Sequence, residues 1–226
     1  VKIVTTSAGN PAKYIGVLKE MGIYVIHVVS SVRTALKAEG AGVDAIVAEG
    51  SESGGKVARD EVPTISLIPQ VLNEVHIPVI AAGGMACGRG LLAALAMGAQ
   101  GIQLGTRFIA SDEAPAHANW KQVLIDCGDS ATAIACRTSS PTRLVKNEFW
   151  DELNALDEPG KTAMDFMPVQ QKGSSRIPTD TDGSKGSYTA GTGSGIIRDV
   201  KPAGDIVREI VAEAEAGMEE MRRAFV

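Results

Sequence analysis

Short apolar runs recur along the first half of the chain and predict buried strands. They fall at residues 2–6, 23–29, 44–48 and 78–82 and at 101–104, and we expect residues 107 and 108 to extend the last run. A strand that is apolar along its whole length is typical of a parallel sheet covered on both faces. The pattern therefore predicts five parallel strands.

Helical patterns separate these runs. Asn followed by Pro at residues 10–11 predicts the start of one helix, and Ser30 or Ser31 predicts the cap of a second. Two further helices are expected around residues 71–75 and 90–97. The alternation of strands and helices predicts the α/β class, in which a closed barrel and an open doubly wound sheet share this local pattern.

The second half of the chain has a different texture. Residues 111–120 are polar, residues 120–127 are weakly helical, and residues 172–195 are rich in Gly, Ser, Thr and Asp and predict an extended loop. From Pro202 or Asp205 onward, apolar residues at helical spacing predict an amphipathic helix on the outside. We therefore divide the chain into a strand-and-helix part (1–110), an insertion and loop region (111–195) and a C-terminal helix that returns to the first part (196–226).

Composition narrows the function classes. The 226 residues include 22 basic and 27 acidic side chains, a formal net charge of -5, which argues against a polybasic nucleic-acid binder. No apolar stretch approaches a membrane span, and the first residues lack a signal-peptide core, so we expect a cytoplasmic protein without membrane contact. The three cysteines show no CxxC spacing, which argues against a zinc site or a disulfide framework.

Two glycine turns follow successive strands and predict an anion site. Gly83 and Gly84 come directly after one strand, which ends at Ala82, and Gly105 and Thr106 follow the next. Glycine lets backbone N–H groups approach a phosphate, the Thr106 hydroxyl can donate to it, and the helix that opens near residues 88–90 would add its dipole. The alternative is that these glycines only turn the chain.

A third loop runs from Glu49 to Lys56 as EGSESGGK and follows the third strand. Its carboxylates, hydroxyls, diglycine and single cation suit catalysis or a cofactor clamp, and a solvated surface loop is the alternative. His117, in the polar segment after the last strand, is a second catalytic candidate beside Lys56.

Four segments resemble one family: VKIVTTSAGNP at 1–11, GVDAIVAEGSESGG at 42–55, IPVIAAGGMACGRGLLAALAMGAQGIQLGTRF at 77–108 and SYTAGTGSG at 187–195. It is the group of FMN-dependent nitronate monooxygenases (2-nitropropane dioxygenases) and flavin-type enoyl-acyl-carrier-protein reductases. The resemblance implies a TIM (β/α)8 barrel and an FMN-dependent oxidoreductase that acts on a small molecule or an acyl thioester, with NADH or NADPH as electron donor. The cofactor contacts it implies are Glu49, Gly50, Gly54, Gly55, Gln70, Ala82, Gly83, Gly84, Gly105 and Thr106.

The chain departs from the family pattern at Lys56. Family members usually carry a histidine after the diglycine as the acid/base or substrate-polarising group, and here that position is lysine. Lysine is a poor base at neutral pH unless its pKa is lowered, but it can stabilise charge on an enoyl oxygen or a nitronate.

The second departure is the number of strands. Five strands are counted where a closed barrel has eight, so the resemblance implies that the first three β/α units are absent and that the chain is a fragment or one piece of a split enzyme. The open edge at residues 2–6 would be covered by a second copy of the chain or by a partner chain. The rival interpretation is a non-catalytic subunit that binds flavin or phosphate.

Overall fold

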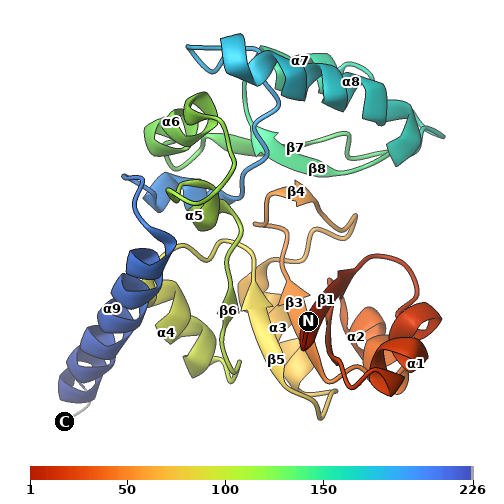
Figure 1. Cartoon of the computed structure of the whole chain (residues 1–226), viewed down its shortest axis with the longest axis vertical. Coiled ribbons are helices and arrows are strands. Elements are labelled where there is room, and N and C mark those ends of the chain that lie inside the picture. The colour runs from red at the N-terminus through yellow and green to blue at the C-terminus, as the bar shows by residue number, and fades with distance from the viewer. Residues whose placement is uncertain (225–226) are drawn as a thin grey trace.

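The computed structural model describes residues 1–224. Five strands form one parallel sheet in the order β1-β2-β3-β5-β6, and Figure 1 shows that the sheet curls. The strands are β1 (Ile3–Ser7), β2 (Tyr24–Val29), β3 (Ala45–Glu49), β5 (Val79–Ala82) and β6 (Ile102–Gln103). The prediction of five parallel strands is confirmed.

Helices connect these strands and cover the sheet. They are α1 (Ala12–Glu20), α2 (Val32–Gly40), α3 (Thr64–Leu72) and α4 (Gly88–Ala96). Ser31 caps α2 as expected, since its side chain accepts from the Thr34 N–H. The helix expected around residues 71–75 is α3, which ends at Leu72 and begins well before that range. It begins at Thr64, where the Glu52 carboxylate accepts from the Thr64 N–H at 2.9 Å.

The core lies between the sheet and these helices. The residues of β3 from Ala45 to Ala48 are all buried, as a strand covered on both faces requires. At the edge of the sheet, Ile3 of β1 is 58% exposed. Among the described residues, β1 pairs with β2 alone.

A second, antiparallel sheet lies beyond the strand ends of the first (Figure 1), and the sequence reasoning missed it. Its strands are β4 (Gly55–Lys56), β7 (Thr132–Ala135) and β8 (Thr142–Val145), in the order β4-β8-β7. The helices α7 (Glu148–Asn154) and α8 (Ala163–Arg176) pack with it around a separate cluster that includes Phe149 and Phe166. Because β4 belongs to the loop that leaves β3, the small sheet is tied to the strand ends.

Two local expectations were wrong. Arg107 and Phe108 do not extend β6 but lie in the short helix α5 (Thr106–Ile109), because Gly105 turns the chain into that helix. The stretch 172–195 is not a continuous loop: it begins in the last turn of α8, and it contains the 3-10 helices η1 (Ile177–Thr179) and most of η2 (Thr192–Ile196).

The remaining helices are α6 (Ala118–Asp126) and the long C-terminal α9 (Ala203–Ala224). The predicted outer helix is thus confirmed over its described part, and Figure 1 shows α9 running along α4. Glycine at residue 88 permits this contact, since a Cβ there would lie 2.5 Å from the Ile210 carbonyl oxygen. No helix among residues 1–224 is both long and apolar enough to cross a membrane.

Candidate functional site

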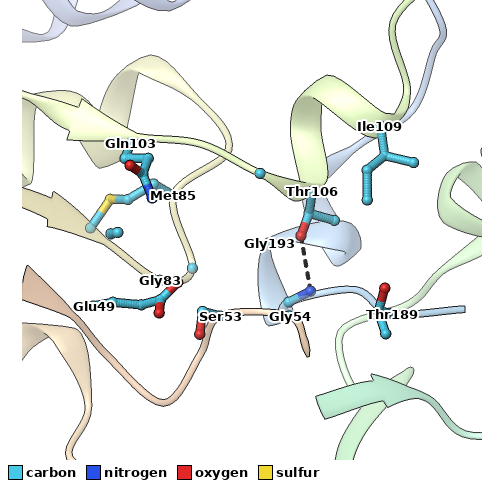
Figure 2. A pocket seen from close by; sticks show the side chains of 14 residues that line it. Glu49, Ser53, Gly54, Gly83, Met85, Gln103, Thr106, Ile109, Thr189 and Gly193 are labelled. Atoms are coloured by element: carbon cyan, nitrogen blue, oxygen red, sulfur yellow. Dashed lines mark hydrogen bonds between the residues drawn. The ribbon is translucent and has the colours of Figure 1, made fainter. Parts of the chain in front are cut away.

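A pocket opens where β3, β5 and β6 end. It encloses about 190 Å³. Figure 2 shows Glu49 and Gln103 toward one end of the pocket and Thr106 and Ile109 toward the other. The lining residues are Glu49, Ser53, Gly54, Ala82, Gly83, Gly84, Met85, Gln103, Gly105, Thr106, Ile109, Thr189, Gly191 and Gly193.

The turn after β5 forms one wall of this pocket. Gly83 and Gly84 have φ angles of +100° and +72°, which side chains rarely adopt. The turn is braced from behind, because Thr64 Oγ1 lies 3.0 Å from the Gly83 carbonyl oxygen and 2.9 Å from the Glu52 carboxylate. Glu52 is therefore occupied as a structural acceptor at the start of α3.

The turn after β6 forms the facing wall. Thr106 Oγ1 accepts a hydrogen bond from the Gly191 N–H at 2.9 Å, the dashed line in Figure 2. The hydroxyl proton of Thr106 is not used in that bond. A side chain at Gly105 would meet no atom within 4 Å. This wall therefore combines a hydroxyl that can donate with an open space beside the backbone.

The loop after β3 supplies the polar floor. Ser53 is buried, and its Oγ forms no hydrogen bond of normal geometry with the described residues, although it lies near the Glu49 carboxyl. Burial raises the pKa of Glu49, and the Ser53 hydroxyl offsets part of that rise. At Gly54 the loop touches residues 189–193, which we call the returning segment. A Cβ at Gly54 would lie 2.6 Å from the carbonyl carbon of Ala190.

A second cavity of about 270 Å³ shares Glu49 with the first and is also lined by Lys56. The Lys56 Nζ donates to Ser140 Oγ at 2.6 Å and to Thr142 Oγ1 at 2.8 Å. Although part of this side chain is exposed, its partial burial lowers the pKa of Lys56. The structure therefore brings the cation of the EGSESGGK loop next to the strand-end pocket.

The chain matches the family described as nitronate monooxygenase over residues 1–213. It belongs to the nitronate monooxygenase family.

Two curated relatives match only part of their own length to this chain. It is 38% identical over 151 residues to a probable nitronate monooxygenase of Staphylococcus saprophyticus, and 40% identical over 149 residues to one of Staphylococcus aureus strain JH9. Each alignment takes in 62% of this chain and 42% of the relative. The chain thus spans about two fifths of the length of the curated relatives it matches.

Two solved structures share the fold over the whole chain. FabK from Thermotoga maritima superposes with a TM-score of 0.90 at 37% identity, and the match covers 100% of this chain and 71% of that one. Nitroalkane oxidase from Streptomyces ansochromogenes gives a TM-score of 0.81 at 28% identity, covering 100% and 66%. The α/β expectation is confirmed, and the curled parallel sheet forms a half-barrel that matches these two TIM-barrel-like structures.

Several residues expected at the site lie elsewhere. His117 is exposed and caps α6, where its Nδ1 accepts from the Asn119 N–H at 3.2 Å. Gln70 is exposed on α3 and donates to the Ser66 carbonyl oxygen at 2.7 Å. Neither side chain lines the pocket. Gly50 and Gly55 belong to the loop after β3, but they are also outside the lining.

The helix start near residues 88–90 does not contribute to the anion site as expected. The Gly88 N–H donates to Oε2 of Glu213, a residue of α9, at 2.7 Å. The Glu213 carboxylate therefore already caps α4. Glu213 lies in the middle of α9, and the local sequence gives no sign that this helix packs along α4.

Sequence reasoning also missed part of the lining. Thr189, Gly191 and Gly193 fall within the SYTAGTGSG segment that carried the resemblance, so their motif was the available signal. Ser53 lay inside the EGSESGGK loop without being singled out. Ser140 and Thr142 gave no signal, because their contact with Lys56 depends on the pairing of β4 with β8. Among residues 1–224, no cluster of His, Cys, Asp or Glu could hold a metal ion.

Proposed function

We propose that the chain is the FMN-binding part of an oxidoreductase that acts as a nitronate monooxygenase or as an enoyl-thioester reductase. The observation that carries the proposal is the pocket between the glycine turns after β5 and β6. In TIM-type barrels the loops after the last two strands are the usual phosphate site. Family membership and the fold shared with FabK and nitroalkane oxidase support the same function.

The residues present fit a phosphate. The Gly84 N–H donates to no other described residue, Thr106 keeps a hydroxyl proton, and the open side of Gly105 leaves room for oxygens. The buried Ser53 Oγ lacks a partner of normal geometry among the described residues. A buried hydroxyl without a partner costs free energy that a bound polar ligand would recover. We infer that Gly83, Gly84, Gly105 and Thr106 hold the phosphate of FMN.

The polar floor fits the hydroxyl-bearing chain of the same cofactor. Glu49 and Ser53 both line this floor, and their side-chain oxygens would hydrogen-bond to ligand hydroxyls. A pocket of about 190 Å³ is smaller than the roughly 300–1,000 Å³ of whole-ligand sites. It suits the phosphate and the adjoining chain, while Ala82 and Gly54 close it on two sides.

When bound, FMN would supply two-electron redox chemistry, and we propose NADH or NADPH as the donor. The chain's own contribution at the reacting end would come from Lys56. Its ammonium group would stabilise negative charge that develops on an oxygen of the substrate, a nitronate or the carbonyl of an unsaturated thioester. In this role Lys56 keeps its proton and does not have to act as a base.

Turnover assays test the function. The FMN-loaded protein is mixed with NADH or NADPH and an unsaturated acyl thioester, and in parallel with an alkyl nitronate and oxygen. We expect consumption of one of the two substrates, and Lys56→Ala to slow it by roughly 10²-fold while FMN stays bound. Binding of FMN without turnover of either substrate would instead identify a non-catalytic flavin-binding subunit.

A further inference from the structure

The small antiparallel sheet places Ser140 and Thr142 within hydrogen-bond distance of the Lys56 ammonium group. We propose that Ser140 and Thr142 are positioning residues, which fix the Lys56 ammonium so that one N–H faces the second cavity and binds an oxyanion of the substrate. The proposal rests on the proposed function and assigns a role to a region that otherwise only covers the strand ends.

The hydrogen bonds around Lys56 are directional. Thr142 Oγ1 donates its own proton to the Ser140 carbonyl oxygen at 2.9 Å, so toward the lysine it can act only as an acceptor. Ser140 Oγ is the second acceptor, at 2.6 Å. The third neighbour, the Ser140 carbonyl oxygen, is 3.5 Å from Nζ, at the limit of a hydrogen bond. Two of the three N–H groups are therefore held firmly, and the third is available to a ligand.

The backbone sets these side chains opposite each other. Lys56 pairs with Thr142 across the antiparallel β4-β8 ladder, and the Val57 N–H donates to the Pro141 carbonyl oxygen at 3.1 Å. Ser140 and Thr142 are 7% and 3% exposed, so their rotamers are restricted by packing. Two acceptors with restricted rotamers therefore hold the end of the otherwise flexible Lys56 side chain.

The charge of Lys56 is left for a ligand. Within the described part of the chain it forms no ion pair, and its three acceptors are neutral oxygens. The other ionisable groups of the cavity are Glu49, His27 and Lys37, and Cys136 lies near Lys56. Burial and the Asp157 charge raise the pKa of Cys136 to about 11, so its thiol stays neutral near pH 7.

The cavity that Lys56 faces suits an oxyanion of modest size. It measures about 270 Å³, and Ser7 and Ser30 are among the residues that line it. A nitronate or a polarised thioester carbonyl offers the negatively charged oxygen that an ammonium N–H and hydroxyl donors stabilise. The shared lining residue Glu49 connects this cavity with the proposed cofactor pocket.

Variants of Thr142 test the positioning role. Thr142→Val keeps the shape and removes the acceptor, and we expect kcat/KM to fall about tenfold, the equivalent of one hydrogen bond, with unchanged FMN affinity. Thr142→Ser should restore activity to near the original level. Thr132→Val on β7 of the same sheet is the matched control and should have no such effect.

A double variant separates positioning from general damage. In the Lys56→Ala protein, Thr142→Val should cause no further loss, because its effect acts through the lysine. The same tenfold loss in both backgrounds, or none in the wild-type background, would overturn the proposal.

Amine labelling makes the test independent of turnover. Lys56 reactivity toward acetic anhydride near pH 8, followed by peptide mass spectrometry, should rise in Thr142→Val and not in Thr132→Val, since the ammonium form loses an acceptor. Unchanged reactivity would contradict the positioning role itself. If Lys56 labelling rises in Thr142→Val as predicted but the protein turns over neither substrate, the proposed function alone is contradicted.

Discussion

Thr106 Oγ1 accepts a hydrogen bond from the Gly191 N–H at 2.9 Å and so joins two segments that are 85 residues apart. The bond links the turn after β6 to the returning segment, and both line the pocket. It also fixes the Thr106 hydroxyl so that its proton can point to a ligand. The pocket is therefore closed by long-range contacts and not by the strand ends alone.

This contact predicts the behaviour of Thr106 variants. Thr106→Val should weaken FMN binding by roughly tenfold, because it removes a phosphate donor and leaves the Gly191 N–H without its acceptor. Thr106→Ser retains the hydroxyl and should bind within about twofold of the wild type. Fluorescence titration of FMN measures both, and equal affinity of the Val variant would exclude Thr106 from the site.

A second contact of the same segment predicts a loss of stability. Gly54→Ala places a Cβ 2.6 Å from the Ala190 carbonyl carbon and 2.7 Å from the Gly191 nitrogen. Since both neighbours are backbone atoms, we expect the free energy of unfolding to fall by about 1–3 kcal/mol. Gly101→Ala is the control, because a Cβ there meets nothing within 4 Å. Urea melts that showed equal losses in the two variants would refute the close approach.

Glu49 predicts a pH-dependent difference. Burial raises its pKa above the ordinary 4.5, so the folded protein binds this proton more tightly than the unfolded chain. The contribution of Glu49 to stability therefore falls as the pH rises from below 4.5 through the folded-state pKa. Glu49→Gln should be more stable than the wild type at pH 8, and the difference should shrink below pH 4. Denaturant melts across this range measure it, and a difference that grows in acid would have the wrong sign.

The strands of the large sheet could be predicted because each is apolar by itself. The run around Ile46 and Val47 is covered on both faces, so its burial is visible in the local sequence. The small sheet could not be predicted in this way. Its strand β4 has two residues. Its strand β8 carries Thr142 and Arg143, whose partners in β4 and in the loop before it lie more than 80 residues away.

The site, too, has some features that the local sequence indicates and others that depend on long-range contacts. Gly83 and Gly105 each follow a strand that is visible in the local sequence, so their place at the strand ends could be predicted, and both line the pocket. The sequence did not indicate that His117 would cap α6, because a histidine in a polar segment carries no signal of the helix that follows it. The cap that Glu213 of α9 gives to the start of α4 could not be predicted, because the contact joins residues 125 positions apart.

Gly105 offers a way to fill the pocket without straining the fold. Its φ of -105° suits any residue, and a side chain there enters open space. Gly105→Val should lower FMN affinity by roughly 100-fold, the loss of two charge-assisted hydrogen bonds of about 1.5 kcal/mol each. Gly101→Val, at the other end of β6, should keep both the affinity and the melting temperature. An undiminished flavin content in Gly105→Val would place the ligand elsewhere.

The phosphate assignment is tested most directly by comparing FMN with riboflavin, which lacks the phosphate. Dissociation constants of the wild-type protein for both are measured by flavin fluorescence in one buffer of fixed ionic strength. The account predicts that riboflavin binds at least roughly 10²-fold more weakly, since it loses the contacts with the Gly83–Gly84 and Gly105–Thr106 turns. Equal affinities for the two flavins would contradict the phosphate pocket.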